Sequence, residues 1–202
     1  MPRTPVEVRR SELVAAALRV IAARGIHAAS TRAIVAEAGM SLASFHYAFE
    51  SRDELIDRLI IDVLAREEKA IAPAQPEGKS LVELLTAALR GYAEHLRADP
   101  AHEQAMLELT QYALRTRPAL AQELYDQYIR IVLSSLTLVT ERTGIRWSVP
   151  LPTVARLLLV LSDGLTLNWL VTRDDAALDA AVVAAADAVA ALAERDPEGS
   201  GG

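Results

Sequence analysis

Hydrophobic and polar positions recur with the period of a helix along almost the whole chain. Leu13, Ala17, Val20 and Ile21 fall at positions i, i+4, i+7 and i+8, which predicts an amphipathic helix from about residue 9 to Gly25. Strand-like alternation of period two is nearly absent. The pattern therefore predicts an all-α chain.

Two short helices are predicted next. Ser30 or Thr31 caps the first of them, which ends at Gly39, and Ser41 caps the second. The turn between them needs a residue that tolerates positive φ, which Gly39 supplies. This spacing is typical of a helix-turn-helix. The second helix should bury Phe45 and Phe49 and direct outward Leu42, Ala43, Ser44, His46 and Tyr47.

Longer helices follow. The sequence S-R-D-E at 51–54 is a capping box, in which the carboxylate of Glu54 should accept from the N–H of Ser51. It starts a helix to about residue 71, which PAQPEGK at 73–79 breaks. Proline, glycine and aspartate borders predict five more helices, for a total of about nine: 79–98, 100–115, 118–143, 151–172 and 174–195.

Charge is spread unevenly. The net charge of the 202 residues is −6, yet residues 1–52 carry seven arginines and four glutamates, a net +3, while residues 53–202 carry a net −9. If the chain binds nucleic acid, the basic first quarter is the place to look. The absence of cysteine excludes disulfides and thiolate metal sites and suits a reducing cytoplasm.

The run TRAIVAEAGMSLASFHYAFESRDEL at 31–55 resembles the helix-turn-helix of the TetR family of transcriptional regulators. The similarity extends from the first helix through Leu55 and includes Gly25, Thr31-Arg32, Ile34, Ala38-Gly39, Ser41, Ala43-Ser44-Phe45, Tyr47, Phe49 and Ser51-Arg52. The resemblance implies a helix-turn-helix DNA-binding domain over 1–52, a helical effector-binding and dimerisation domain over 53–196, and a flexible tail at 197–202. This sequence departs from the family pattern at His46, Ala48 and Glu50. Relatives usually carry a different aromatic residue, a histidine and a proline at these three positions, respectively.

The resemblance implies DNA contacts at nine positions. Arg32 can donate to guanine O6 and N7, or it can pair with Glu37 on the surface. Arg52 is either a phosphate clamp or a partner of Asp53 or Glu54, and His46 either a DNA contact or a solvated surface group. Leu42 and Ala43 can meet thymine methyl groups, which predicts an operator with some A·T content. The nine are Thr31, Arg32, Ser41, Leu42, Ala43, Ser44, His46, Tyr47 and Arg52.

A small helix-turn-helix makes few phosphate contacts, so strong binding usually requires two copies and a palindromic operator. The two C-terminal helices form a predicted hairpin whose alanines and valines allow close approach of a second copy, as in the four-helix bundle that the family uses. Alternatively, the hairpin closes the monomer's own core. The predicted dimer residues are Leu158, Leu161, Leu165, Val182, Val183 and Val189.

Polar and aromatic groups in the later helices are the candidates for an effector site. In relatives a cavity in this region binds a small molecule and changes the spacing of the two DNA-binding domains through the fourth helix. Each group could equally be an ordinary core or interface residue. The composition favours a largely apolar or aromatic effector. The candidates are Met106, Gln111, Tyr112, Tyr125, Tyr128, Asp163, Asn168 and Trp169.

No catalytic motif is present: the chain has no G-x-S-x-G, no P-loop, no G-x-G-x-x-G and no H-E-x-x-H. The four histidines are scattered, so no metal or other cofactor is expected. Arg156, Asp163 and Asn168 interrupt the most apolar run, so no membrane span is expected. The sequence thus predicts a cytoplasmic DNA-binding regulator, a repressor rather than an activator on the family's usual behaviour, with a helical protein-interaction module as the alternative.

Overall fold

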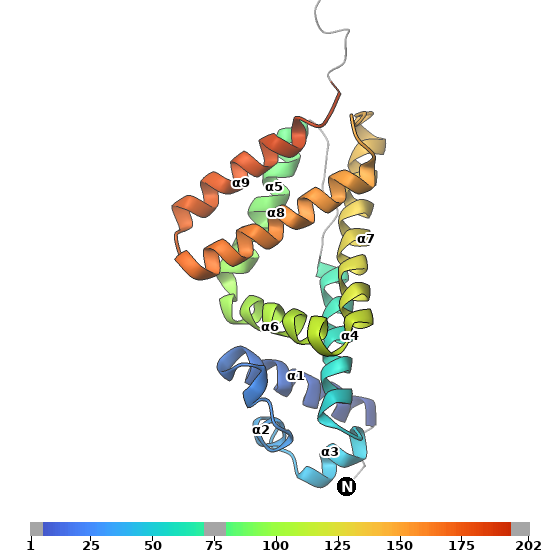
Figure 1. Cartoon of the computed structure of the whole chain (residues 1–202), viewed down its shortest axis with the longest axis vertical. Coiled ribbons are helices and arrows are strands. Elements are labelled where there is room, and N and C mark those ends of the chain that lie inside the picture. Colours follow the sequence, from blue (N-terminus) through green and yellow to red (C-terminus); the bar gives the residue numbers. More distant parts are fainter. Residues whose placement is uncertain (1–5, 71–79, 195–202) are drawn as a thin grey trace, which may run out of the picture. The chain divides into compact units, whose positions relative to one another are not determined.

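The computed structural model of the protein describes residues 6–70 and 80–194, and within these ranges the named secondary-structure elements are all helices (Figure 1). The all-α prediction is confirmed, and most helix borders fall within three residues of the predicted ones. In chain order the elements are α1 (Val6–Arg24), the short 3-10 helix η1 (Ile26–Ala28), α2 (Thr31–Glu37), α3 (Leu42–Ala48), α4 (Arg52–Ala70), α5 (Leu81–Ala98), α6 (Pro100–Thr116), α7 (Pro118–Thr143), α8 (Leu151–Thr172) and α9 (Asp175–Ala190). The predicted break at 73–79 and the predicted tail at 197–202 lie outside the described residues.

Side-chain caps fix the starts of the two short helices. The Ser30 hydroxyl accepts from the N–H of Ala33 at 3.2 Å, and the Ser41 hydroxyl accepts from the N–H of Ser44 at 3.1 Å. Each bond satisfies a donor that the first turn of a helix leaves unpaired. Gly39, in the turn between α2 and α3, has φ of 64°, so the predicted need for a glycine there is confirmed.

The capping box at the start of α4 is only half formed. The Ser51 hydroxyl accepts from the N–H of Glu54 at 3.1 Å, as predicted. The prediction that the Glu54 carboxylate accepts from the N–H of Ser51 is wrong. This carboxylate accepts instead from the N–H of Glu50, at 2.7 Å. Its second oxygen accepts from Arg10 of α1 at 3.1 Å, so the carboxylate is oriented by a neighbouring helix as well as by its own first turn.

The chain divides into two compact units. The first contains α1 to α4, α6 and the start of α7, within residues 6–70 and 99–125, and the second contains α5 and the chain from residue 126. This division differs from the predicted boundary at residue 52 because α6 packs on α1 and η1. The core of the first unit includes Leu13, Ile21, Ile34, Phe45, Phe49, Leu55 and Leu109.

In the second unit α8 and α9 form the predicted hairpin, and α9 packs along α5 (Figure 1). The prediction that the last helix continues to residue 195 is wrong. Beyond Ala190 the chain leaves the helix, because the N–H of Ser148 bonds to the Leu192 carbonyl and that of Glu194 to the Arg146 carbonyl, each at 2.8 Å. Trp147 and Ala193 thereby form an isolated antiparallel bridge.

Of the helices in the described ranges, α8 is the one long and apolar enough to cross a membrane by length and composition. Its apolar side chains Val154, Leu158, Leu165 and Trp169 are buried in the core of the second unit. Packing against α5 and α9 therefore accounts for the apolar side chains on its buried face.

Candidate nucleic-acid interface

The helix α3 has one buried and one exposed face. Phe45 and Phe49 are 1% and 2% exposed, and their ring centroids lie 5.9 Å apart. Both therefore belong to the core, as predicted. On the opposite face Leu42 and Tyr47 are 44% and 51% exposed. Ala43 and His46 are also exposed, and Ser41 and Ser44 join the face through a hydroxyl contact of 3.0 Å.

His46 packs edge-on against Phe45, with ring centroids 5.6 Å apart and an interplanar angle of 82°. This contact holds the imidazole at the boundary between core and surface, while the side chain remains exposed. His46 is thus oriented by the core, and its polar atoms are available to a partner of α3.

On α2, Thr31 is half-buried and Arg32 is exposed. The alternative in which Arg32 pairs with Glu37 is wrong, because the Glu37 carboxylate binds Arg19 of α1 at 2.7 Å. Arg32 is therefore left at the surface beside the start of α2. A guanidinium in that position suits base or phosphate recognition.

Arg52 has a role that the sequence did not indicate. Its guanidinium donates to the carbonyl of Ala29 and to the carbonyl of Ile26, each at 2.7 Å. The predicted alternative, a pair with Asp53, is present at the longer distance of 3.6 Å. Arg52 thus fixes the segment that leads into α2, and the backbone carbonyls occupy two of its donors. The N–H groups of Arg52 that do not bind these carbonyls are the ones left for the predicted phosphate contact.

Two arginines of α1 that are not among the nine predicted DNA contacts also contact α3 and its flank. Arg10 donates to the carbonyl of Ala48 at 2.8 Å and lies over the Phe49 ring at 5.1 Å. Arg9 lies over the Tyr47 ring at 5.3 Å. The available signal was a pair of consecutive arginines in the basic first quarter of the chain.

Three polar side chains join helix α6 and its C-terminal cap to the helix-turn-helix scaffold. Glu108 accepts from the N–H of Ile26 at 2.6 Å, and the Tyr112 hydroxyl donates to Asp53 at 3.2 Å. Arg117, at the end of α6, binds Asp53 and Asp57 of α4 at 3.3 Å each. The bond to Asp57 is the main cause that raises the pKa of Arg117 above its ordinary value. Side chains of α6 therefore reach both the turn before α2 and the first turns of α4.

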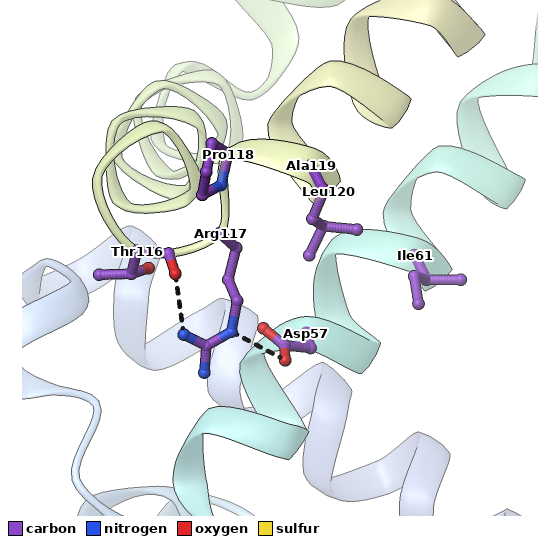
Figure 2. A pocket seen from close by; sticks show the side chains of 7 residues that line it. All are labelled: Asp57, Ile61, Thr116, Arg117, Pro118, Ala119 and Leu120. Atoms are coloured by element: carbon purple, nitrogen blue, oxygen red, sulfur yellow. Dashed lines mark hydrogen bonds and ion pairs between the residues drawn. The ribbon is translucent and has the colours of Figure 1, made fainter.

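A cleft of about 470 Å³ lies between α4 and the junction of α6 and α7 (Figure 2). Arg117 crosses it, donating to Asp57 on one side and to the Thr116 carbonyl on the other. The remaining lining is apolar: Ile61, Pro118, Ala119 and Leu120. None of the eight predicted effector residues lines this cleft.

The predicted effector residues are divided between the two units. In the first unit Met106 is buried, Gln111 and Tyr125 are exposed, and Tyr112 binds Asp53. In the second unit Tyr128 is half-buried, and Asp163 and Asn168 are exposed. Trp169 is buried, and its N–H donates to Asp175 at 2.8 Å while Arg173 stacks on its ring at 4.6 Å. Tyr112 and Trp169 thus have structural partners. Within the described ranges, no group of three His, Asp or Glu side chains is placed to hold a metal ion.

The predicted dimer residues lie mostly inside the second unit. Val182 and Val189 have no exposed surface, and Leu158 and Leu165 are buried with them, so these four side chains contribute to the core of the second unit. The reason is that α9 packs on both α5 and α8 and uses this stripe for its own core. Leu161 is half-buried and Val183 is exposed. The exposed apolar side chains of the hairpin are instead Val160, Leu167, Val171 and Val183.

Comparison with known proteins agrees with this arrangement. Residues 13–59 match the family model of bacterial regulatory proteins of the tetR family. The chain is 26% identical over 169 residues, 83% of its length and 86% of the relative's, to the nicotine-responsive transcriptional repressor HdnoR of Paenarthrobacter nicotinovorans.

Solved structures share the fold. A TetR transcription regulator from Haloarcula marismortui is similar over 93% of this chain and 100% of its own, with a TM-score of 0.75 and 18% identity. The multidrug binding protein EbrR, complexed with imidazole, is similar over 94% and 97%, with a TM-score of 0.65 and 24% identity.

The capped turn, the exposed face of α3 and the helical body define a helix-turn-helix DNA-binding regulator. Residues 13–59 carry the pattern of the tetR family of bacterial regulatory proteins, and most of the chain is similar to a transcriptional repressor.

Proposed function

We propose that the protein is a cytoplasmic repressor that binds a palindromic operator as a homodimer and is released by a small, largely apolar or aromatic effector. The observation that carries the proposal is the exposed face of α3, where Leu42, His46 and Tyr47 lie over a core built on Phe45. A helix so presented fits the major groove, with its N-terminal residues at base edges. HdnoR, a relative over most of the chain, is named as a repressor.

Apolar groups on the hairpin support dimerisation. Leu167 and Val171 are 56% and 75% exposed on α8, and Val183 of α9 adds to them. Exposed apolar side chains grouped on one pair of helices favour self-association, since two-fold symmetry brings the same surface of each copy together. The proposed interface uses these residues rather than the buried stripe around Val182.

The cleft beside Arg117 is the proposed effector site. Its apolar lining suits a small apolar or aromatic molecule, and one oxygen of Asp57 is buried without a hydrogen-bond partner among the described residues. An effector that donates to the Asp57 carboxylate would compete with Arg117, which donates to its other oxygen, Oδ2. Because Arg117 also binds Asp53 of α4, displacing it would disturb the scaffold of α3. HdnoR is named as nicotine-responsive, and EbrR is described with imidazole, so each relative is associated with a small nitrogen heterocycle.

Selection of duplexes from a random pool, followed by a screen for small molecules that release the selected duplex, tests the proposal. We expect inverted half-sites spaced by one helical turn or a multiple of it, and release by an apolar or aromatic compound. His46→Ala should change the preferred base pair at one position of each half-site. The exposed Gln111, on α6, provides a control, and Gln111→Ala should leave the preferred sequence unchanged. A selection that enriches no sequence would favour the protein-interaction module instead.

A further inference from the structure

Consecutive arginines on α1 have different partners. Successive positions on a helix point about 100° apart, and Arg9 and Arg10 accordingly contact different groups of α3 and its flank. Arg10 donates to the carbonyl of Ala48 and to Glu54, and it is half-buried over the Phe49 ring. Its hydrogen-bonding groups are committed to holding the end of α3 against α1 and α4.

Arg9 lies at the edge of the exposed face instead. Its guanidinium carbon is 5.3 Å from the centroid of Tyr47, a cation–π contact with a side chain that is 51% exposed. In the described ranges no carboxylate pairs with Arg9. Glu7, two residues earlier on α1, is directed to Arg58 of α4 at 3.6 Å. The positive charge of Arg9 is thus not compensated within this surface.

We propose that Arg9 is a DNA-contacting residue that binds a backbone phosphate next to Tyr47 and holds the Tyr47 ring in place for the operator. A guanidinium stacked on an aromatic ring keeps its N–H groups in the plane and directed outward, where they match the oxygens of a phosphate. The stack also restrains both side chains before binding, which lowers the entropy lost on complex formation. The contact to DNA is therefore extended from α2 and α3 to the first turn of α1. The inference rests on the proposed function, the binding of an operator.

Fluorescence anisotropy on the selected duplex over a range of salt concentrations tests the assignment. Arg9→Gln should weaken binding by about tenfold and should reduce the slope of log K against log salt by about 0.9 for each protomer bound. Because a phosphate contact carries no sequence information, the slope should fall equally on an unrelated duplex. Arg9→Lys keeps the charge and should keep the slope, although it loses the planar stack.

The matched control is Arg24→Gln, which removes the same charge from the last turn of α1, about 22 Å further along the helix. It should retain the wild-type affinity and slope. Weaker binding of Arg9→Gln with an unchanged slope would overturn the phosphate contact, because it would reduce Arg9 to a packing partner of Tyr47. Wild-type protein that binds no duplex at any salt concentration would overturn the operator function itself, a distinct result.

Discussion

The carboxylate of Glu108 on α6 accepts a hydrogen bond from the backbone N–H of Ile26 at 2.6 Å. Ile26 begins η1, so its N–H has no partner within the helix, and a charged acceptor satisfies it strongly. Through this bond α6, which is more than eighty residues away in sequence, fixes the turn that leads into α2. Gly25 permits this approach, because a Cβ there would lie 3.2 Å from a Glu108 oxygen.

Two glycine substitutions separate backbone strain from this contact. Gly25 has φ of 80° and ψ of 163°, a region that essentially only glycine occupies, so Gly25→Ala should cost about 2–3 kcal/mol of unfolding free energy. Gly39 has φ of 64° and open space around it, so Gly39→Ala should cost about 1–2 kcal/mol. Urea unfolding measures both. In a Glu108→Ala background the cost of Gly25→Ala should shrink; an undiminished cost would show that the carboxylate adds nothing.

Arg52→Gln should destabilise the protein by about 2–3 kcal/mol, because the carbonyls of Ala29 and Ile26 lose two charge-assisted donors. DNA binding should weaken with a nearly unchanged salt slope if the role of Arg52 is to position α2. Arg32→Gln, at an exposed arginine of α2, should leave the unfolding free energy within about 0.5 kcal/mol of wild type. A stable Arg52→Gln protein with a reduced salt slope would instead support the phosphate clamp expected from the resemblance.

Leu167→Glu should convert a dimer into monomers, since two-fold symmetry would bring like charges together in an apolar contact. Leu114 on α6 has the same exposure, 55% against 56%, and lies outside the hairpin. Leu114→Glu should therefore leave the molar mass in sedimentation equilibrium unchanged. Dissociation by Leu114→Glu, or a dimer that survives Leu167→Glu, would place the interface elsewhere. Val182→Ala should lower stability without acting on the interface directly, because Val182 is wholly buried.

Asp175 gives a pH dependence with a defined sign. Its bond from Trp169, followed by that from Arg97, holds the pKa of Asp175 below its ordinary value. The carboxylate therefore stabilises the fold fully above the unfolded pKa of about 3.9, and this contribution is lost as the pH falls through the lower folded value. Asp175→Asn should be less stable than wild type at pH 7, and the difference should narrow below about pH 4. Asp187→Asn, on the exposed side of α9, is the matched control, and thermal unfolding over this pH range compares the two variants.

The helices and the helix-turn-helix could be predicted from the sequence because they depend on interactions between residues close together in the chain. Caps such as Ser30 and Ser41, the glycine of the turn and the stripe that contains Phe45 act over three or four residues, so their spacing is written directly in the chain. The family landmarks lie in the same short stretch. The burial of Phe45 and Phe49 and the exposure of His46 and Tyr47 followed from that period.

Only the tertiary structure decided which long-range partner each polar or apolar group meets. Arg52 binds two carbonyls, Tyr112 binds Asp53, and Val182 faces its own core, because α6 packs on α1 and α9 packs on α5. Helical periodicity identifies the face that is buried, but it carries no information about which distant helix covers that face. For the same reason Glu108 could not be assigned to Ile26 from the sequence, since the two residues are 82 positions apart and the bond depends on the folded path of the chain.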